Sequence, residues 1–347
     1  MVQHVSPFVG AAIAKRFYDE PKHVELPGWS WIVFVIDALL FAPLFLYVAY
    51  TLGAVLPTLA MVEDPNPPAY EALAVNEDAE PAAGSSTVVS DGKPVTSSIR
   101  ATTRLLRSIA GWRALFRGIV PAFAAVFATQ TLAQFVGAFG LPAFVGTLVA
   151  SLALVQLSTV WVHVVISAPN PRPFYCRLPP LRKTFEATCF PVLINWAAVS
   201  ASASVPILIA KALGLEIWNP RQPNEVPKYG GQDGWKVLVM WLVAVSLHVL
   251  LVVPSTVVLV RVQASLLPQE DETVVPFDSS FQGRVGPAVV DGKGFVTARD
   301  ALATFGRSSW IRLVKLYIKT WAVGVAAYFV VALVLLPEMW LILSKAK

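Results

Sequence analysis

Charged side chains are scarce in this chain of 347 residues: Asp, Glu, Lys and Arg together make up 14%, whereas hydrophobic residues make up 56%. An ordinary soluble domain carries about 25% charged residues. The mean hydropathy of +0.62 points the same way. The composition therefore excludes a typical soluble globule and predicts an integral membrane protein.

Cysteine is almost absent as well. Cys176 and Cys189 are too few for a disulfide framework, and no Cys-x-x-Cys or Cys/His grouping indicates a metal site. The HExxH and GxSxG motifs and triad-like groupings are missing, and the Gly-Lys pairs at 92–93 and 292–293 lack the spacing of a phosphate-binding loop. We therefore expect no enzymatic activity and no cofactor.

The basic excess does not indicate a nucleic-acid partner. The net charge is +5 and the pI is near 9.2, but the Lys and Arg residues are dispersed in the connections between apolar runs and form no compact patch. Basic loops of this kind orient a membrane protein, because they stay on the cytosolic or matrix side. We therefore expect contact with membrane lipids and no binding of nucleic acid.

Six apolar runs are long enough to cross a hydrocarbon core of about 30 Å as helices. They lie near residues 29–58, 119–139, 142–167, 189–214, 235–262 and 313–343. The lack of period-two alternation favours helices over barrel strands. Between the first two runs, apolar residues and arginines alternate at helical spacing from Thr96 to Arg117. This pattern predicts an amphipathic surface helix that Thr96 or Ser97 caps.

Similar segments recur at intervals of about 100 residues, which predicts three copies of one unit. LPTLAMVEDP from Leu56, LSTVWVHVVIS from Leu157 and VPSTVVLVRVQAS from Val253 share one form. The predicted fold is an all-α membrane protein with six transmembrane helices in three pseudo-repeats and with amphipathic surface helices. The expected divisions are a tail at 1–28 and repeats at 29–140, 141–214 and 215–347, with a disordered Pro-rich loop at 63–95 in the first repeat.

The third copy, PSTVVLVRVQ, contains Pro254, Arg261 and Gln263, and Pro57 is the proline of the first copy. This pattern resembles the signature of the mitochondrial carrier family, and GWRALFRG before the second run resembles a further carrier motif. The resemblance implies a six-helix carrier fold in a mitochondrial membrane, with the inner and outer membranes both open, and transport of a small solute. It also implies that cardiolipin binds at Phe116, Arg117 and Gly118.

The chain departs from the carrier pattern at the charges that close the carrier gate. The signature acids are replaced by Leu59, Thr159 and Thr256, and the bases by Val62, Val162 and Leu259. Ion pairs therefore cannot form at these positions. We expect a divergent carrier-like protein that handles a solute without the usual charged gates.

Several polar side chains interrupt the apolar runs. Asp37 lies deep in the first run, where a carboxylate costs at least about 2.5 to 3.5 kcal/mol unless it meets water or a partner. The others are Gln130, Gln134, Asn195 and His248. One interpretation is that these five residues line a solute cavity. The alternative is that each makes an ordinary packing bond between helices.

Two short segments suggest partners. Phe116, Arg117 and Gly118 precede a helix start, whose free amides suit a lipid phosphate, although Arg117 could also simply anchor the membrane boundary. Pro67, Pro68 and Tyr70 form a PPxY sequence of the kind that WW domains bind. The alternative function is therefore a non-transporting scaffold of the outer mitochondrial membrane that recruits a WW-domain protein such as a ubiquitin ligase.

Overall fold

A computed structural model describes residues 27–64, 94–216, 230–231, 233–286 and 293–345. In these residues the regular structure is helical, apart from an isolated antiparallel bridge between Ser167 and Thr273. The predicted all-helical class is confirmed. The chain divides into two compact units, one formed by residues 1–46 with 322–347 and the other by residues 47–321.

The helices have the length and apolarity that a membrane span requires. Five such stretches are Ser30–Val62, Ile99–Ala138, Leu181–Ala212, Gly234–Ala264 and Arg307–Ile342. A sixth span is formed if the helices Ala143–Ala153 and Val155–Ile166, which meet at a bend of 61°, are taken together. The chain is therefore an integral membrane protein with five or six spanning helices in its described part.

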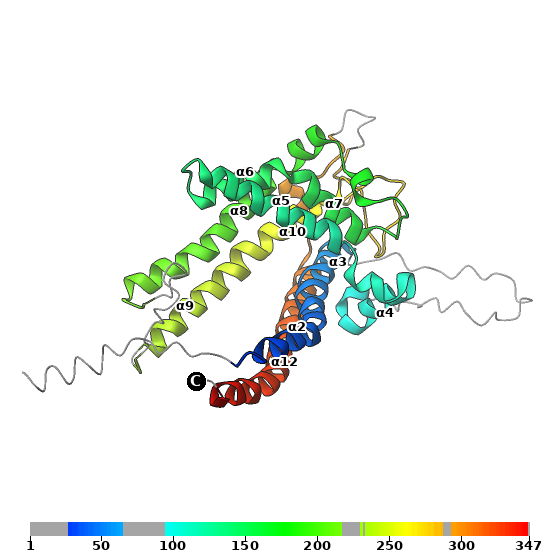
Figure 1. Ribbon diagram of the computed structural model, residues 1–347. Helices are drawn as coiled ribbons and strands as arrows, with labels where there is room; N and C mark the ends of the chain where they lie inside the picture. The colour runs from blue at the N-terminus through cyan, green and yellow to red at the C-terminus, as the bar shows by residue number, and fades with distance from the viewer. Residues whose placement is uncertain (1–26, 65–93, 217–229, 232, 287–292, 346–347) are drawn as a thin grey trace, which may run out of the picture. The chain divides into compact units, whose positions relative to one another are not determined.

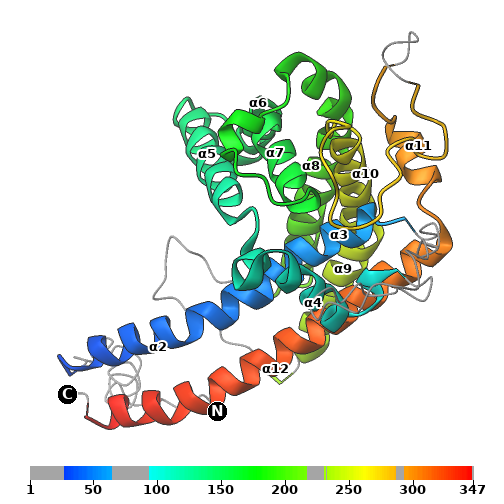
Figure 2. The same cartoon turned by 90° about the vertical axis from the view of Figure 1, so that its right-hand side faces the viewer.

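The first unit contains α2 (Ser30–Leu46) and the later part of α12 (Arg307–Lys345), which lie side by side in Figure 2. The rings of Phe45 and Tyr328 are 5.5 Å apart between centroids. Asp37, which precedes Phe45 on α2, contacts Glu338, which follows Tyr328 on α12. The two helices therefore run antiparallel.

In the second unit, two spans change their helical pitch before a proline. The π-helix η1 (Tyr47–Val55) leads into α3 (Leu56–Val62), where Pro57 occupies the first turn. The π-helix η5 (His248–Val252) leads in the same way into α10 (Val253–Ala264). A proline has no amide to donate, so it is tolerated where the preceding hydrogen-bond pattern has already changed.

The middle span has no proline at this point and bends instead. α6 (Ala143–Ala153) and α7 (Val155–Ile166) are separated at Leu154 and meet at 61°. This break was not predicted from the sequence, which indicated one run at 142–167.

The three segments that share the repeated form come together in space. α3, α7 and α10 contact one another pairwise, and they lie together in Figure 1. Their mutual contact buries apolar side chains that we call the apolar plug: Leu59, Val62, Val162, Val257 and Val260. Each of these side chains is at most 4% exposed. The plug is therefore a tightly packed core between three helix segments that are far apart in sequence.

The remaining helices of the second unit surround this core. α5 (Ile119–Ala138) packs against α6, and a Cβ added at Gly146 would lie only 2.6 Å from the Ala133 carbonyl oxygen. Gly146 therefore permits the close approach of these two helices. α8 (Leu181–Ala212) packs against both α10 and α9 (Gly234–Leu247).

The predicted amphipathic helix is α4 (Ile99–Ala110), which has arginines on its exposed side and buries Leu106. Its cap was predicted wrongly: the Ser98 hydroxyl accepts the amide of Ala101, and Thr96 lies in the preceding turn. In the second predicted repeat the amphipathic segment is not separate, because it forms the first turns of α8.

Candidate functional site

Arg261 joins three parts of the second unit at the end of α10. Its side chain is 8% exposed. Nε donates to the carbonyl of Ala301 at 2.9 Å, Nη1 donates to the carbonyl of Met61 at 3.0 Å, and Nη2 donates to the Thr304 hydroxyl at 2.9 Å. These bonds connect α10 to α3 and to the segment around α11 (Ala298–Ala303). The Arg261 guanidinium thus donates to uncharged groups, namely two carbonyls and one hydroxyl.

A turn in the loop after α10 supports this arginine with an aromatic ring. The Arg261 guanidinium lies 4.9 Å from the ring centre of the buried Phe281. The Asp278 carboxylate accepts from the Ser280 hydroxyl at 2.6 Å and from the Gln282 amide at 2.7 Å, which closes the turn around Phe281. Burial alone would raise the pKa of Asp278, but these hydrogen bonds hold the pKa below its usual value.

Gln263 makes the corresponding connection to α7. Its side-chain amide donates to the Ser158 hydroxyl at 3.0 Å, and its backbone carbonyl lies 2.9 Å from Nε2 of the buried His163. We call Arg261 and Gln263, with their partners on α3 and α7, the polar latch. Arg261 and Gln263 therefore connect α10 to neighbouring segments through hydrogen bonds.

A buried ion pair lies close to the latch, between Glu63 after α3 and Arg312 on α12. Nη1 of Arg312 is 3.4 Å from Oε2 of Glu63, and Nη2 donates to the Glu63 carbonyl at 2.9 Å. The carboxylate also accepts from the amides of Val95 at 2.6 Å and Thr96 at 3.1 Å, and from the Thr96 hydroxyl. This pair was not predictable from the sequence, because its members are 249 residues apart.

A cavity of about 250 Å³ lies between the start of α5 and the segment after α7. We call it the arginine pocket because Arg113, Arg117, Arg172 and Arg177 line it, and no acidic side chain is among its lining residues. Nη1 of Arg117 is buried there without a hydrogen-bond partner. Arg177 is already paired with Asp271 at 3.0 Å, so the charges of Arg113, Arg117 and Arg172 and the free donor are what suit a phosphate group.

The predicted lipid-phosphate residues lie at this pocket only in part. Arg117 and Gly118 line it, whereas Phe116 packs against the hydrophobic core. Gly118 has a φ of 72°, a left-handed conformation that turns the chain into α5 at Ile119. The Nε and Nη2 atoms of Arg117 donate to the carbonyl of Val164 at 3.2 and 3.0 Å. Arg117 is therefore also a structural link between α5 and α7.

Asp37 is buried in the first unit, where its carboxyl lies next to the carboxyl of Glu338 on α12. Oε2 of Glu338 is buried without a hydrogen-bond partner. The described part of α2 has no Lys, Arg or His to neutralise this pair. This contact favours the packing interpretation of Asp37, and the cavity interpretation stays a prediction.

We expect Asp37→Leu to lower the melting temperature of the purified protein, because it leaves the Glu338 carboxyl without its partner in an apolar region. Asp37→Asn keeps a hydrogen-bonding group and should melt closer to the unaltered protein. The double variant Asp37→Leu with Glu338→Leu should recover part of the loss. Equal melting temperatures for Asp37→Leu and Asp37→Asn would contradict the packing role.

The other predicted cavity residues have different surroundings. Gln130 and Gln134 are exposed on α5. The Asn195 amide donates to the hydroxyls of Ser255 at 3.1 Å and Thr256 at 3.0 Å, so it joins α8 to α10. Asn195 is thus engaged in helix packing.

His248 lines a cavity of about 670 Å³ between α8, the α9 to α10 span and α12. Gln130, Gln134 and Asn195 are not among the residues that line it. This cavity therefore contains only His248 of the four residues.

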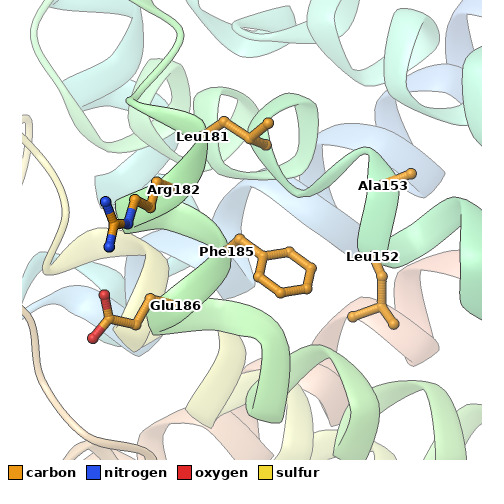
Figure 3. A pocket seen from close by; sticks show the side chains of 6 residues that line it. All are labelled: Leu152, Ala153, Leu181, Arg182, Phe185 and Glu186. Carbon is orange, nitrogen blue, oxygen red and sulfur yellow. The ribbon is translucent and has the colours of Figure 1, made fainter.

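A hollow of about 890 Å³ lies where the end of α6 faces the start of α8 (Figure 3). Phe185 points towards Leu152 across it, whereas Arg182 and Glu186 point to the other side of α8. None of the predicted site residues lines this hollow, and its walls are mostly apolar.

The PPxY residues Pro67, Pro68 and Tyr70 lie outside the described residues. Comparisons with protein families, with characterised proteins and with solved structures found no match to this chain. The carrier resemblance therefore stays an interpretation of the residues themselves.

Proposed function

We propose that this protein is a divergent carrier-like protein of a mitochondrial membrane that moves a small solute by parting α3, α7 and α10. The observation that supports this proposal is the meeting of three segments of similar sequence at the apolar plug. In this proposal the three segments belong to three pseudo-repeats. Their contact then forms the closed end of a solute path.

The plug and the latch suggest how such an end closes without ion pairs. Apolar packing excludes water, and its strength does not depend on opposite charges meeting across the path. The hydrogen bonds of Arg261 and Gln263 hold the helix ends in register at the rim. Opening requires α10 to release the Met61 carbonyl and the Ser158 hydroxyl, both of which can then bond to water.

We further propose that the arginine pocket holds the phosphate of an anionic membrane lipid such as cardiolipin. Four arginine side chains line it, and Arg117 has a buried nitrogen without a partner. A lipid held there would link the start of α5 to the end of α7. This role fits a mitochondrial membrane, where anionic lipid is abundant, and it leaves the choice between inner and outer membrane open.

Opening of the plug can be tested without knowing the solute. In a protein with Cys176→Ser and Cys189→Ser, we expect the single cysteine of Val162→Cys to react with a membrane-impermeant maleimide in native liposomes. Val162 is 1% exposed, so reaction requires α3, α7 and α10 to separate. Mass spectrometry of the intact protein measures the labelled fraction over time.

The matched control is Ala150→Cys, which is fully buried on α6 and is not part of the plug. It should react only after denaturation. If Val162→Cys is equally unreactive in the native protein, α3, α7 and α10 do not separate and the transport proposal fails. A scaffold with a permanently closed bundle would give that result.

The adaptor hypothesis makes a separate prediction. If the PPxY sequence recruits a partner, Tyr70→Ala should abolish capture of a purified WW domain by the full-length protein, because it removes the tyrosine that completes the motif. Tyr47→Ala is a useful comparison, because it removes a tyrosine outside the motif. Equal capture by the unaltered protein and by Tyr70→Ala would remove the motif from consideration.

A further inference from the structure

The cavity at His248 differs from the other cavities in its aromatic walls. We call it the aromatic cavity, and its walls include Trp241, Trp310, Tyr317 and Trp321. Its volume of about 670 Å³ lies in the range of sites that hold small organic molecules. Flat aromatic walls favour flat, rigid ligands, which stack on them at a low entropic cost.

Two polar side chains from different helices face this cavity, Ser202 on α8 and His248 at the start of η5. Within the described part of the chain neither side chain is hydrogen-bonded to the protein. Ser202 is half-buried and His248 is exposed, so both side chains are open to a ligand in the cavity. A π-helical turn such as η5 is uncommon and is frequently found at functional sites.

The lining of the cavity restricts the ligand further. His248 lies close to the middle of the 31-residue stretch Gly234–Ala264, whereas the wall residues Trp310 and Trp321 lie in the first half of Arg307–Ile342. The walls are mostly apolar, and no Asp, Glu, Lys or Arg is among the residues that line them. An acyl chain suits such walls but offers no hydrogen-bond acceptor to the two polar side chains. The ligand should therefore be apolar overall and should carry an uncharged acceptor.

We infer that the aromatic cavity binds a quinone, with its ring against the indole walls and a carbonyl oxygen accepting hydrogen bonds from His248 and Ser202. A quinone is flat and uncharged, and its oxygens only accept hydrogen bonds. A neutral imidazole N–H and a hydroxyl are suitable donors. The assignment concerns binding, and it does not depend on solute transport.

The test uses the full-length protein in phosphatidylcholine nanodiscs and a benzoquinone with a decyl tail as the probe. Binding is followed by saturable quenching of tryptophan fluorescence. We expect His248→Phe, which keeps an aromatic ring but removes the donor, to raise the dissociation constant about tenfold. His248→Phe with Ser202→Ala should raise it further. Leu250→Phe is the matched control, because Leu250 is 70% exposed in the same π-helix and does not line the cavity.

Circular dichroism and melting temperature confirm that each variant is folded. An azidoquinone should label peptides that contain residues 241–249 or 310–321, and decanol should not displace the probe. Three results would overturn the assignment: quenching that does not saturate, equal affinity in the unaltered protein and in the double variant, or displacement by decanol at the concentration at which unlabelled quinone competes. The last result would identify the cavity as an acyl-chain groove.

Discussion

Arg261→Ala will lower the free energy of unfolding by on the order of 3–5 kcal/mol. The buried guanidinium donates to Ala301, Met61 and Thr304, and hydrogen bonds from charged donors are the stronger class. Truncation removes the donor of the Met61 carbonyl and leaves the Ala301 carbonyl with only the long 3.4 Å bond from the Thr304 hydroxyl. It also leaves a cavity above Phe281. Denaturant unfolding in detergent, followed by circular dichroism, measures the change.

Arg261→Lys separates the charge from the geometry. A lysine keeps the positive charge but cannot donate in three fixed directions, so we expect a loss between those of the unaltered protein and Arg261→Ala. The control is Arg284→Ala, because the Arg284 side chain is 46% exposed and its ion pair with Asp300 is open to solvent. That variant should unfold almost like the unaltered protein. If Arg261→Ala has as small an effect as Arg284→Ala, the polar latch does not stabilise the fold.

Glu63→Ala will be comparably destabilising, at about 3–5 kcal/mol, because it leaves the buried Arg312 guanidinium without its ion-pair partner. It also removes the acceptor of the Val95 and Thr96 amides. Arg312→Met should cost less, because the Glu63 carboxylate keeps those donors. The expected order, with Glu63→Ala more harmful than Arg312→Met, follows from this asymmetry in hydrogen bonding.

A double-mutant cycle isolates the pair. Glu63→Ala with Arg312→Met should be less destabilised than the sum of the single variants, because neither charge is then left alone. Lys236→Ala serves as the comparison, since the Lys236–Asp233 pair is partly exposed to solvent and joins neighbouring residues of one segment. Strictly additive losses in the Glu63 and Arg312 cycle would show that the two side chains do not interact in the folded protein.

Composition and periodicity were sufficient to predict helical membrane spans, because a bilayer demands long apolar runs whose backbone groups bond internally. The three similar segments at Leu56, Leu157 and Val253 were also recognisable, and they are the ones that meet in space. The middle span was predicted as one straight run, because nothing in its composition indicates the 61° bend at Leu154.

The candidate site was less accessible to sequence reasoning. Arg261 and Gln263 were singled out from the sequence, but the hydrogen-bond partners that the structure gives them were not predictable. Asp37 was recognised as an unusual group, and its contact with Glu338 depends on how α2 and α12 lie in the first unit. The surroundings of a polar residue in a span depend on which helix packs against it. The sequence of one apolar run does not indicate which helix that is.

The sequence by itself determined that this chain is a helical membrane protein. Its many apolar residues and few charges favour the hydrocarbon core of a bilayer over water. Only the tertiary structure decided what each polar side chain meets. Arg261 meets the backbone carbonyl of Met61, Glu63 meets Arg312, and His248 lies in a cavity with aromatic walls. The physical reason is that hydrophobicity acts on each residue alone, whereas a hydrogen bond or an ion pair needs two groups at a fixed distance. That distance is set by packing between helices far apart in the chain.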